Sequence, residues 1–187
     1  MNKLARFDKE LFNLINGKWH NDFFDAVMPF LRNANFWLPL YLFLFLFVLS
    51  NFRKNAWWWI FFFAGTVILA NFISSNVIRE IFFRLRPCND PAMADNIRVL
   101  VNYRPQSSGF ISSHAANHFA MAAFLYLTLK DYIGKWGLLF FLWAFIIVYA
   151  QVYVGVHYPF DILRGTLIGF VFGYLSAKAF NKTYNTV

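Results

Sequence analysis

Two histidines of this chain, His114 and His157, lie where hydrophilic loops run into long apolar segments. Asp161 follows His157 by four residues, and a carboxylate there can bind one ring nitrogen, fix the tautomer and make the other nitrogen a better nucleophile. Ionisable groups beside apolar segments of membrane length indicate a functional site. A structural interpretation stays open, in which Asp161 caps the helix that begins near Pro159. The two roles are compatible, because a capping carboxylate can also face His157.

The other histidine ends the segment Gly109–His114, which leads directly into an apolar run. Ser112 and Ser113 can cap a helix that begins near His114, and the free N–H groups of a helix N-terminus bind anions. At that position His114 could give a proton to a leaving oxygen. The alternative is an ordinary helix cap followed by a hydrated histidine.

Arginines supply the third cluster. Arg79 precedes Arg86 by seven residues, so the two guanidiniums would lie two turns apart on one face if the helix continues to Arg86. Arginine binds phosphate oxygens in a bidentate manner, although interfacial arginines that extend toward water are the alternative. The loop 83–113 contains four arginines, including Arg86, and an anionic ligand would balance their positive charge. These residues are Arg84, Arg86, Arg98 and Arg104.

A metal site is disfavoured. The spacing of His114 and His118, together with His157, is compatible with zinc, but no glutamate base is near and the arginines would repel a cation. We therefore expect no metal and no other cofactor. His118 is expected to be a packed side chain, with a supporting role in the site as the alternative.

The composition places these residues in a membrane protein. Of the 187 residues, 59% are hydrophobic and 14% are charged, against about 25% charged in an ordinary soluble domain. The net charge of +8 is interpreted as membrane topology and phosphate chemistry, so no nucleic-acid partner is expected. Apolar runs without period-two alternation predict helices. The runs are Phe36–Ser50, Trp57–Ile78, His114–Leu129, Trp136–Gly155 and Asp161–Phe180.

The predicted fold is an all-α, polytopic membrane bundle of five to six transmembrane helices, forming one domain over residues 1–187. Residues 1–34 are expected to be interfacial, with an amphipathic helix over Leu4–Ile15, and residues 35–180 to form the transmembrane core. Residues from Phe23 onward could add a sixth crossing. Three glycines at four-residue spacing would let a neighbouring helix approach the last run closely. They are Gly165, Gly169 and Gly173.

Basic residues predict the orientation. Lysines and arginines follow the first, third and fifth apolar runs, so they share one side, which the positive-inside rule makes cytoplasmic. These residues are Arg53, Lys54, Lys130, Lys135, Lys178 and Lys182. His114 and His157 then face the opposite side, which is the periplasm for a bacterial inner membrane.

Taken in chain order, the three clusters resemble the type-2 phosphatidic acid phosphatase superfamily, whose pattern is K-x6-R-P, then P-S-G-H, then S-R-x5-H-x3-D. The corresponding segments here are Arg79-x6-Arg86-Pro87, Ile111-Ser112-Ser113-His114 and Ala150-Gln151-x5-His157-x3-Asp161. The resemblance extends from the second apolar run to the fifth.

This resemblance implies a six-helix phosphatase core, a phosphohistidine intermediate and no metal requirement. By position, His157 corresponds to the nucleophile, Asp161 to its orienting partner and His114 to the general acid. The phosphate-binding group corresponds to Arg79, Arg86, Ser112 and the backbone N–H of Ser113.

The chain departs from the family pattern at several positions. Arg79 replaces a lysine, Ile111 a proline and Ser113 a glycine, and Ala150 stands in place of a serine. Gln151, expected at the phosphate, replaces the third arginine. A lost charged contact to a phosphoryl transition state costs about 2–4 kcal/mol, or roughly 30- to 1000-fold in rate. Compensation could come from Arg104 or Arg164.

The leading hypothesis is an integral membrane lipid phosphate phosphatase, with a lipid phosphate and the bilayer as partners and the oligomeric state left open. Undecaprenyl diphosphate, phosphatidic acid or phosphatidylglycerophosphate is favoured as substrate, because the loop 83–113 is short for a large saccharide head group. A lipid A phosphatase is the alternative within the family. A catalytically weak lipid-phosphate binder is the alternative outside catalysis, and a transporter is disfavoured because no inverted repeat is present.

Overall fold

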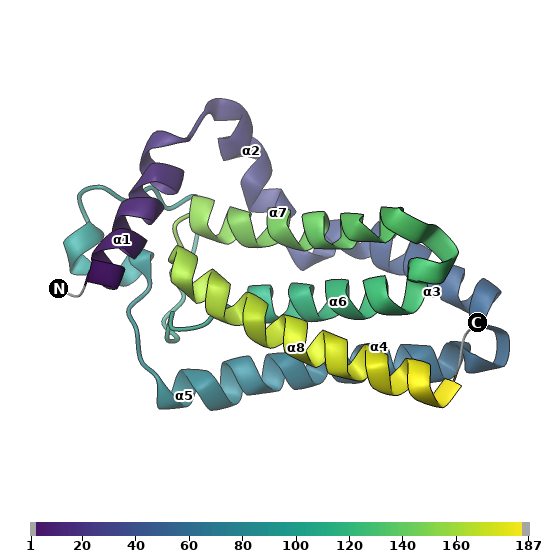
Figure 1. Cartoon of the computed structure of the whole chain (residues 1–187). Coiled ribbons are helices and arrows are strands. Elements are labelled where there is room, and N and C mark those ends of the chain that lie inside the picture. Colours follow the sequence, from purple (N-terminus) through teal and green to yellow (C-terminus); the bar gives the residue numbers. More distant parts are fainter. Residues whose placement is uncertain (1–2, 185–187) are drawn as a thin grey trace.

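The computed structural model describes residues 3–184, and helices without any strand form this part of the chain. Five long helices make the bundle (Figure 1). They are α3 (Leu38–Phe52), α4 (Ala56–Phe72), α6 (Ser113–Ile133), α7 (Leu139–Tyr153) and α8 (Pro159–Tyr184). Each corresponds to one predicted apolar run, so the all-α prediction is confirmed.

Three continuous helical stretches are long and apolar enough to cross a membrane: Ala34–Ile81, Ser113–Tyr153 and Pro159–Tyr184. The first two each fold back once, at the 3-10 turns η3 (Arg53–Asn55) and η7 (Gly134–Leu138), and so provide two legs of the bundle each. The first stretch starts with the 3-10 turn η2 and ends with the π turn η4 and the short α5. Their bounds are Ala34–Trp37, Ile73–Ile78 and Arg79–Ile81.

The described chain has no sixth crossing. Helix α2 (Asp22–Leu31) contains 10 residues and includes Pro29. Its length of about 15 Å at the usual rise per residue is half of what a hydrocarbon core of about 30 Å requires. The possible crossing from Phe23 onward is therefore replaced by a short helix that leads into the first span.

The predicted N-terminal helix is present as α1 (Lys3–Phe12), which continues into the π turn η1 (Asn13–Lys18). Phe12 and Asp8 are buried, whereas Leu4 and Phe7 are exposed. The helix packs on the loop end of the bundle, where Phe12 contacts the ring of Tyr158 edge-on at 5.3 Å between centroids.

Close packing of α6 on α8 depends on the three glycines of α8. A Cβ at Gly165, Gly169 or Gly173 would collide with backbone carbonyls of α6 or its cap. The carbonyls belong to Ser112, Ala116 and Ala120. The predicted close approach is thus confirmed, and it places the N-terminus of α6 beside the N-terminus of α8 (Figure 1).

The two ends of the bundle differ in chemistry. The basic turns η3 and η7 lie at the same end as the last turn of α8, as the basic residues predicted. At the other end, residues 82–112 form a long connection that contains only two 3-10 turns, η5 (Pro87–Asn89) and η6 (Pro91–Met93). The helix α1 and the starts of α6 and α8 lie at this second end. The candidate site residues His114 and Asp161, in the first turns of α6 and α8, are therefore both at this end.

Candidate active site

Arg86 does not continue the helix that carries Arg79. Helix α5 ends at Ile81, and Arg86 is extended, with φ −74° and ψ 155°. The ring of Pro87 disfavours helical backbone in the residue before it, which explains the conformation of Arg86. The expectation of two arginines on one helix face is therefore wrong, and the loop brings Arg86 into the site instead.

The guanidinium of Arg86 contacts the His157 ring directly. Arg86 Nη1 lies 2.7 Å from His157 Nε2 and 3.2 Å from the Val156 carbonyl oxygen, and Arg86 Nε donates to the Ser107 carbonyl. Because a guanidinium has only donors, Nε2 of His157 is the acceptor, and the neutral ring carries its proton on Nδ1. The lone pair of Nε2 is thus directed at the Arg86 guanidinium.

Burial keeps His157 neutral. Its exposed fraction is 1%, and burial, together with the charges of Arg86, Arg79 and Arg32, holds the pKa of His157 well below its usual 6.5. Burial and the charge of Arg79 also lower the pKa of Arg86 to about 10, so Arg86 stays charged at neutral pH. An unprotonated imidazole beside a charged guanidinium is what a nitrogen nucleophile for an anionic group requires.

Asp161 supports the other side of this ring. Its Oδ2 lies 3.6 Å from His157 Nδ1 and accepts the backbone N–H of Tyr158 at 2.9 Å. The second contact is that of a carboxylate in the first turn that reaches back to the residue before its helix. Asp161 Oδ1 accepts from Arg84 at 2.6 Å and from Arg164 at 3.3 Å. Asp161 therefore caps its helix and places a carboxylate beside His157 Nδ1, which has no hydrogen-bond partner among the described residues.

Ser112 caps helix α6 as predicted, with its hydroxyl accepting from the Ala115 N–H at 3.3 Å. Its own N–H donates to the Asp161 carbonyl at 3.1 Å, so the starts of α6 and α8 are bonded to each other. Arg79 reaches this cap, since it donates to the Ile111 carbonyl at 3.2 Å and to Ser113 Oγ at 3.0 Å.

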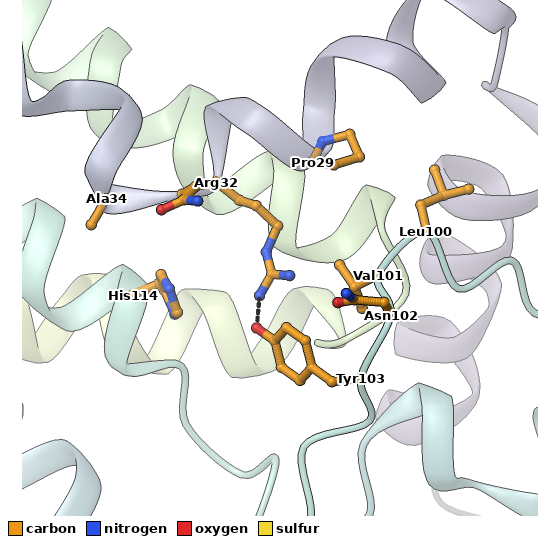
Figure 2. A pocket seen from close by; sticks show the side chains of 9 residues that line it. Pro29, Arg32, Ala34, Leu100, Val101, Asn102, Tyr103 and His114 are labelled. Carbon is orange, nitrogen blue, oxygen red and sulfur yellow. Dashed lines mark hydrogen bonds between the residues drawn. The ribbon is translucent and has the colours of Figure 1, made fainter.

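His114 lies on the same end of the bundle, directly after Ser113, whose hydroxyl accepts from Arg79. It also lines a cavity of about 580 Å³, into which Arg32 and Tyr103 point (Figure 2). The structure therefore brings the two predicted histidines together with both predicted arginines, although the four residues come from different segments of the chain.

Gln151 is fully buried in α7, and neither its side-chain oxygen nor its nitrogen has a hydrogen-bond partner among the described residues. Its backbone carbonyl accepts the N–H groups of Val156 and His157 at 3.2 and 3.3 Å. A phosphate-binding role of the Gln151 side chain stays a prediction. Of the two arginines considered as compensation, Arg164 contacts Asp161, whereas Arg104 donates to the Cys88 carbonyl.

Sequence reasoning did not assign Arg84 and Asp8 to the site. Arg84 Nη2 pairs with Asp8 Oδ2 at 2.6 Å, and its guanidinium lies 4.3 Å from the centroid of the Tyr158 ring. Burial raises the pKa of Asp8, and the bond from Arg84 opposes this effect. The one feature of the sequence that could have indicated Asp8 was the position of its carboxylate near the apolar face of the predicted amphipathic helix.

Arg32 was also not assigned. It follows α2, its exposed fraction is 7%, and its Nη2 donates to the Tyr103 hydroxyl at 2.9 Å (Figure 2). No carboxylate of the described residues pairs with it, and its Nε has no hydrogen-bond partner there. The sequence places Arg32 in the N-terminal segment, far along the chain from both histidines, so spacing gave no signal for it.

His118 is packed. Its Nδ1 lies 2.8 Å from the His114 carbonyl oxygen, and its ring contacts Trp143 edge-on at 5.2 Å between centroids. Within residues 3–184, no three histidine, cysteine or acidic side chains come together as metal ligands. The packed interpretation of His118 thus agrees with the structure.

The structure is a helical membrane bundle that brings two histidines, a carboxylate and several arginines to one end. The family model described as the PAP2 superfamily matches residues 59–184. The chain therefore belongs to the PAP2 superfamily, and the predictions of this family and of a membrane phosphatase are confirmed.

Curated relatives are similar over most of the chain. A protein named lipid A 4'-phosphatase from Bacteroides thetaiotaomicron is 33% identical over 175 residues, which are 92% of this chain and 76% of the relative. A protein named undecaprenyl-diphosphatase from Sulfolobus acidocaldarius is 29% identical over 92% of this chain and 78% of the relative.

Solved structures show the same fold. The crystal structure of Aquifex aeolicus LpxE matches with a TM-score of 0.63 and 27% identity, over 92% of this chain and 95% of that chain. A PAP2-type phosphatidylglycerolphosphate phosphatase from Bacillus subtilis matches with a TM-score of 0.71 over 98% of this chain and 88% of that chain. Its identity of 20% supports the fold alone.

Proposed function

We propose that this protein hydrolyses a phosphate ester or diphosphate of a membrane lipid through a phosphohistidine at His157. The observation that carries this proposal is the position of the buried His157 ring between Arg86 at Nε2 and Asp161 at Nδ1. When Arg86 turns its N–H groups from Nε2 to the phosphoryl oxygens, this nitrogen becomes available to phosphorus, while Nδ1 faces a carboxylate that stabilises the positive ring formed during attack.

In the first step, His157 Nε2 forms a bond to phosphorus, and the bond from phosphorus to the lipid oxygen breaks. His114, which enters the step as the imidazolium ion, gives a proton to that oxygen and becomes neutral, so that the lipid leaves as a neutral alcohol, or as a monophosphate if the substrate is a diphosphate. Arg86 and Arg79 bind the phosphoryl oxygens together with the cap formed by Ser112 and Ser113. Positioning and charge stabilisation supply most of the acceleration in phosphoryl transfer.

In the second step, His114 takes a proton from water, whose oxygen bonds to phosphorus while the bond between phosphorus and Nε2 breaks. Inorganic phosphate leaves, and both histidines return to their starting protonation states. Every group in this scheme belongs to the chain itself or to water, so we propose that the reaction requires no metal.

For the substrate, we propose a lipid phosphate, with lipid A and undecaprenyl diphosphate as the two candidates to compare directly. One relative named lipid A 4'-phosphatase and one named undecaprenyl-diphosphatase are each similar to this chain over about nine tenths of its length. The sequence preference for a prenyl or glycerol lipid therefore stays a prediction beside the saccharide alternative. We further propose that the site faces the periplasm from a bacterial inner membrane, because the basic turns lie at the opposite end.

The test is phosphate release by the purified protein in detergent from a panel of lipid A, undecaprenyl diphosphate, phosphatidic acid and phosphatidylglycerophosphate, with and without chelator. We expect release from at least one lipid, equal rates with chelator, and no release by His157→Ala although the variant still inserts. Acid-labile phosphate on the wild-type protein, absent from His157→Ala, would identify the intermediate. Full activity of His157→Ala would reject the nucleophile.

A lipid-phosphate binder without turnover is the second candidate, and the buried, unbonded Gln151 side chain favours it. Both candidates predict that lipid phosphates bind, but only the enzyme releases phosphate over many turnovers. Retention of lipid phosphate by the wild-type protein, with no release from any member of the panel, would support the binder.

A further inference from the structure

Arg32 is a buried charge that the structure does not neutralise. Its exposed fraction is 7%, its Nη2 donates to the Tyr103 hydroxyl, and its Nε has no hydrogen-bond partner among the described residues. A buried arginine is normally paired with a carboxylate, because an unpaired charge away from water is costly. At the same end of the bundle, Arg84 and Arg98 have such partners, in Asp161 and Asp25. Arg79 and Arg86, the two arginines predicted to bind phosphate, bond to Ser113 and His157 instead of to a carboxylate, as Arg32 bonds to Tyr103.

The surroundings of Arg32 indicate where its partner lies. Its side chain points from the end of α2 into the cavity of about 580 Å³ that His114 also lines (Figure 2). Arg32 and His114, the proposed general acid, therefore line the same cavity. Tyr103 holds the guanidinium from the opposite wall, with Arg32 5.5 Å from the centroid of its ring.

Arg32 could also supply a positive charge that the site lacks at position 151. Gln151 stands where the family pattern has its third arginine, and its amide is buried without a hydrogen bond among the described residues. That position supplies no positive charge to a bound phosphate in this chain. A guanidinium from another segment, on the side of His114, would restore the number of cations around the phosphoryl group.

We propose that Arg32, held by Tyr103, binds the phosphoryl group of the substrate from the cavity side and replaces the guanidinium that Gln151 cannot provide. The inference rests on the proposed function, since the ligand is the phosphate that His157 attacks. The chemical class recognised is a phosphomonoester or terminal phosphate. Inorganic phosphate and orthovanadate present similar anionic oxygens and can therefore serve as probes of the same site.

The test compares Arg32→Ala with Arg104→Ala, a control from the same end of the bundle whose guanidinium is bonded to the Cys88 carbonyl. We expect Arg32→Ala to lower kcat/KM by about 100- to 1000-fold and to weaken inhibition by orthovanadate strongly. Arg104→Ala should stay within about twofold of the wild type in both. Equal kcat/KM and equal orthovanadate inhibition in Arg32→Ala and the wild type would overturn the proposal.

A rescue experiment separates a phosphate ligand from a structural arginine. In the double variant Arg32→Ala/Gln151→Arg, the new arginine should recover at least about tenfold of the lost kcat/KM. No recovery, with both variants folded by size exclusion and thermal unfolding, would contradict the replacement. If Arg32→Ala does not fold, Arg32→Lys tests the proposal instead. Lysine keeps the charge but loses the bidentate geometry, so kcat/KM should fall by at least about tenfold.

Binding of inorganic phosphate, measured by calorimetry, distinguishes this inference from the proposed function. If the wild type releases phosphate from no lipid, the proposed function fails, whereas weaker phosphate binding in Arg32→Ala than in Arg104→Ala still supports Arg32 as a phosphate ligand. Equal phosphate binding in the two variants would reject that role even in an active enzyme.

Discussion

Arg84 and Asp161 form a 2.6 Å ion pair that joins the loop after α5 to the first turn of α8. The same guanidinium pairs with Asp8 of α1, also at 2.6 Å. Asp161 in turn faces the His157 ring, so the N-terminal helix is connected to the candidate nucleophile through one arginine. The helix α1 is thereby part of the support of the site as well as a cover on the loop end of the bundle.

Removal of Arg84 should destabilise the protein and slow catalysis. Arg84→Ala leaves the carboxylates of Asp8 and Asp161 buried without this partner, which typically costs about 3–5 kcal/mol. Unfolding in detergent measures the loss, and we expect kcat to fall because Asp161 no longer holds its position. The control is Arg6→Ala in α1, the helix that carries Asp8. The pair of Arg6 with Glu10 is exposed and contributes less than about 1 kcal/mol. Similar losses in the two variants would contradict the bridge.

His157 should remain neutral well below the usual pH range of histidine. Its pKa is lowered first by burial and then by Arg86, so in an NMR titration the ring should take up its proton well below pH 6.5. Because the unfolded state binds this proton first, the contribution to stability is complete above about pH 6.5 and falls as the pH drops below it.

Arg86→Gln removes one of the charges that lower this pKa, so the titration of His157 should shift upward. The acid limb of kcat/KM should shift in the same direction where activity remains. Arg104→Gln is the matched control, because the Arg104 guanidinium is bonded to the Cys88 carbonyl, whereas Arg86 contacts the His157 ring. An unchanged titration in Arg86→Gln would show that Arg86 does not set the pKa.

Local pattern was sufficient to predict the helices and the order of the site segments. The apolar runs gave the five long helices, and the spacing of Gly165 and Gly169 gave the face on which α6 packs. Ser112 was recognisable as a cap because its side chain bonds within its own turn. Each of these features is decided by residues that are close together in the sequence.

Features that depend on contacts between distant segments were not predictable. The pairs Arg84–Asp8 and Arg32–Tyr103 join residues more than 70 positions apart, and no periodicity connects them. The helix expected to reach Arg86 ended at Ile81, because the proline restriction and the contacts of the extended loop outweigh helical propensity there. Charge counts showed an excess of arginine in this region but not which arginine faces the histidines.

The glycine face of α8 should be sensitive to the smallest substitution. Gly169→Ala places a methyl group against the backbone of Ala116, so α6 and α8 must separate. We expect a loss of about 1–3 kcal/mol in unfolding free energy, as in other overpacked interiors, and a fall in kcat because both helices carry site residues. Gly65→Ala in α4 is the control. Its added methyl group meets no atom within 4 Å, and alanine there should stabilise the helix by about 1 kcal/mol.

Asn16 should control the loop that carries Tyr103. Its fully buried side chain donates to the carbonyls of Arg98 and Tyr153 at 2.8 and 2.7 Å and accepts the Arg98 N–H at 2.9 Å. Asn16→Ala leaves these backbone groups unbonded, at a cost of about 1–3 kcal/mol.

We also expect Asn16→Ala to raise KM, because the loop after Arg98 positions Tyr103 and, through it, Arg32. Asn51→Ala provides the comparison, since the exposed Asn51 side chain bonds only to Phe47 of its own helix and should change stability by less than about 0.5 kcal/mol. A raised KM in Asn16→Ala with unchanged kcat would locate the effect in binding. If KM is unchanged although stability falls, the loop is held by contacts other than Asn16, and the link from η1 to the cavity is refuted.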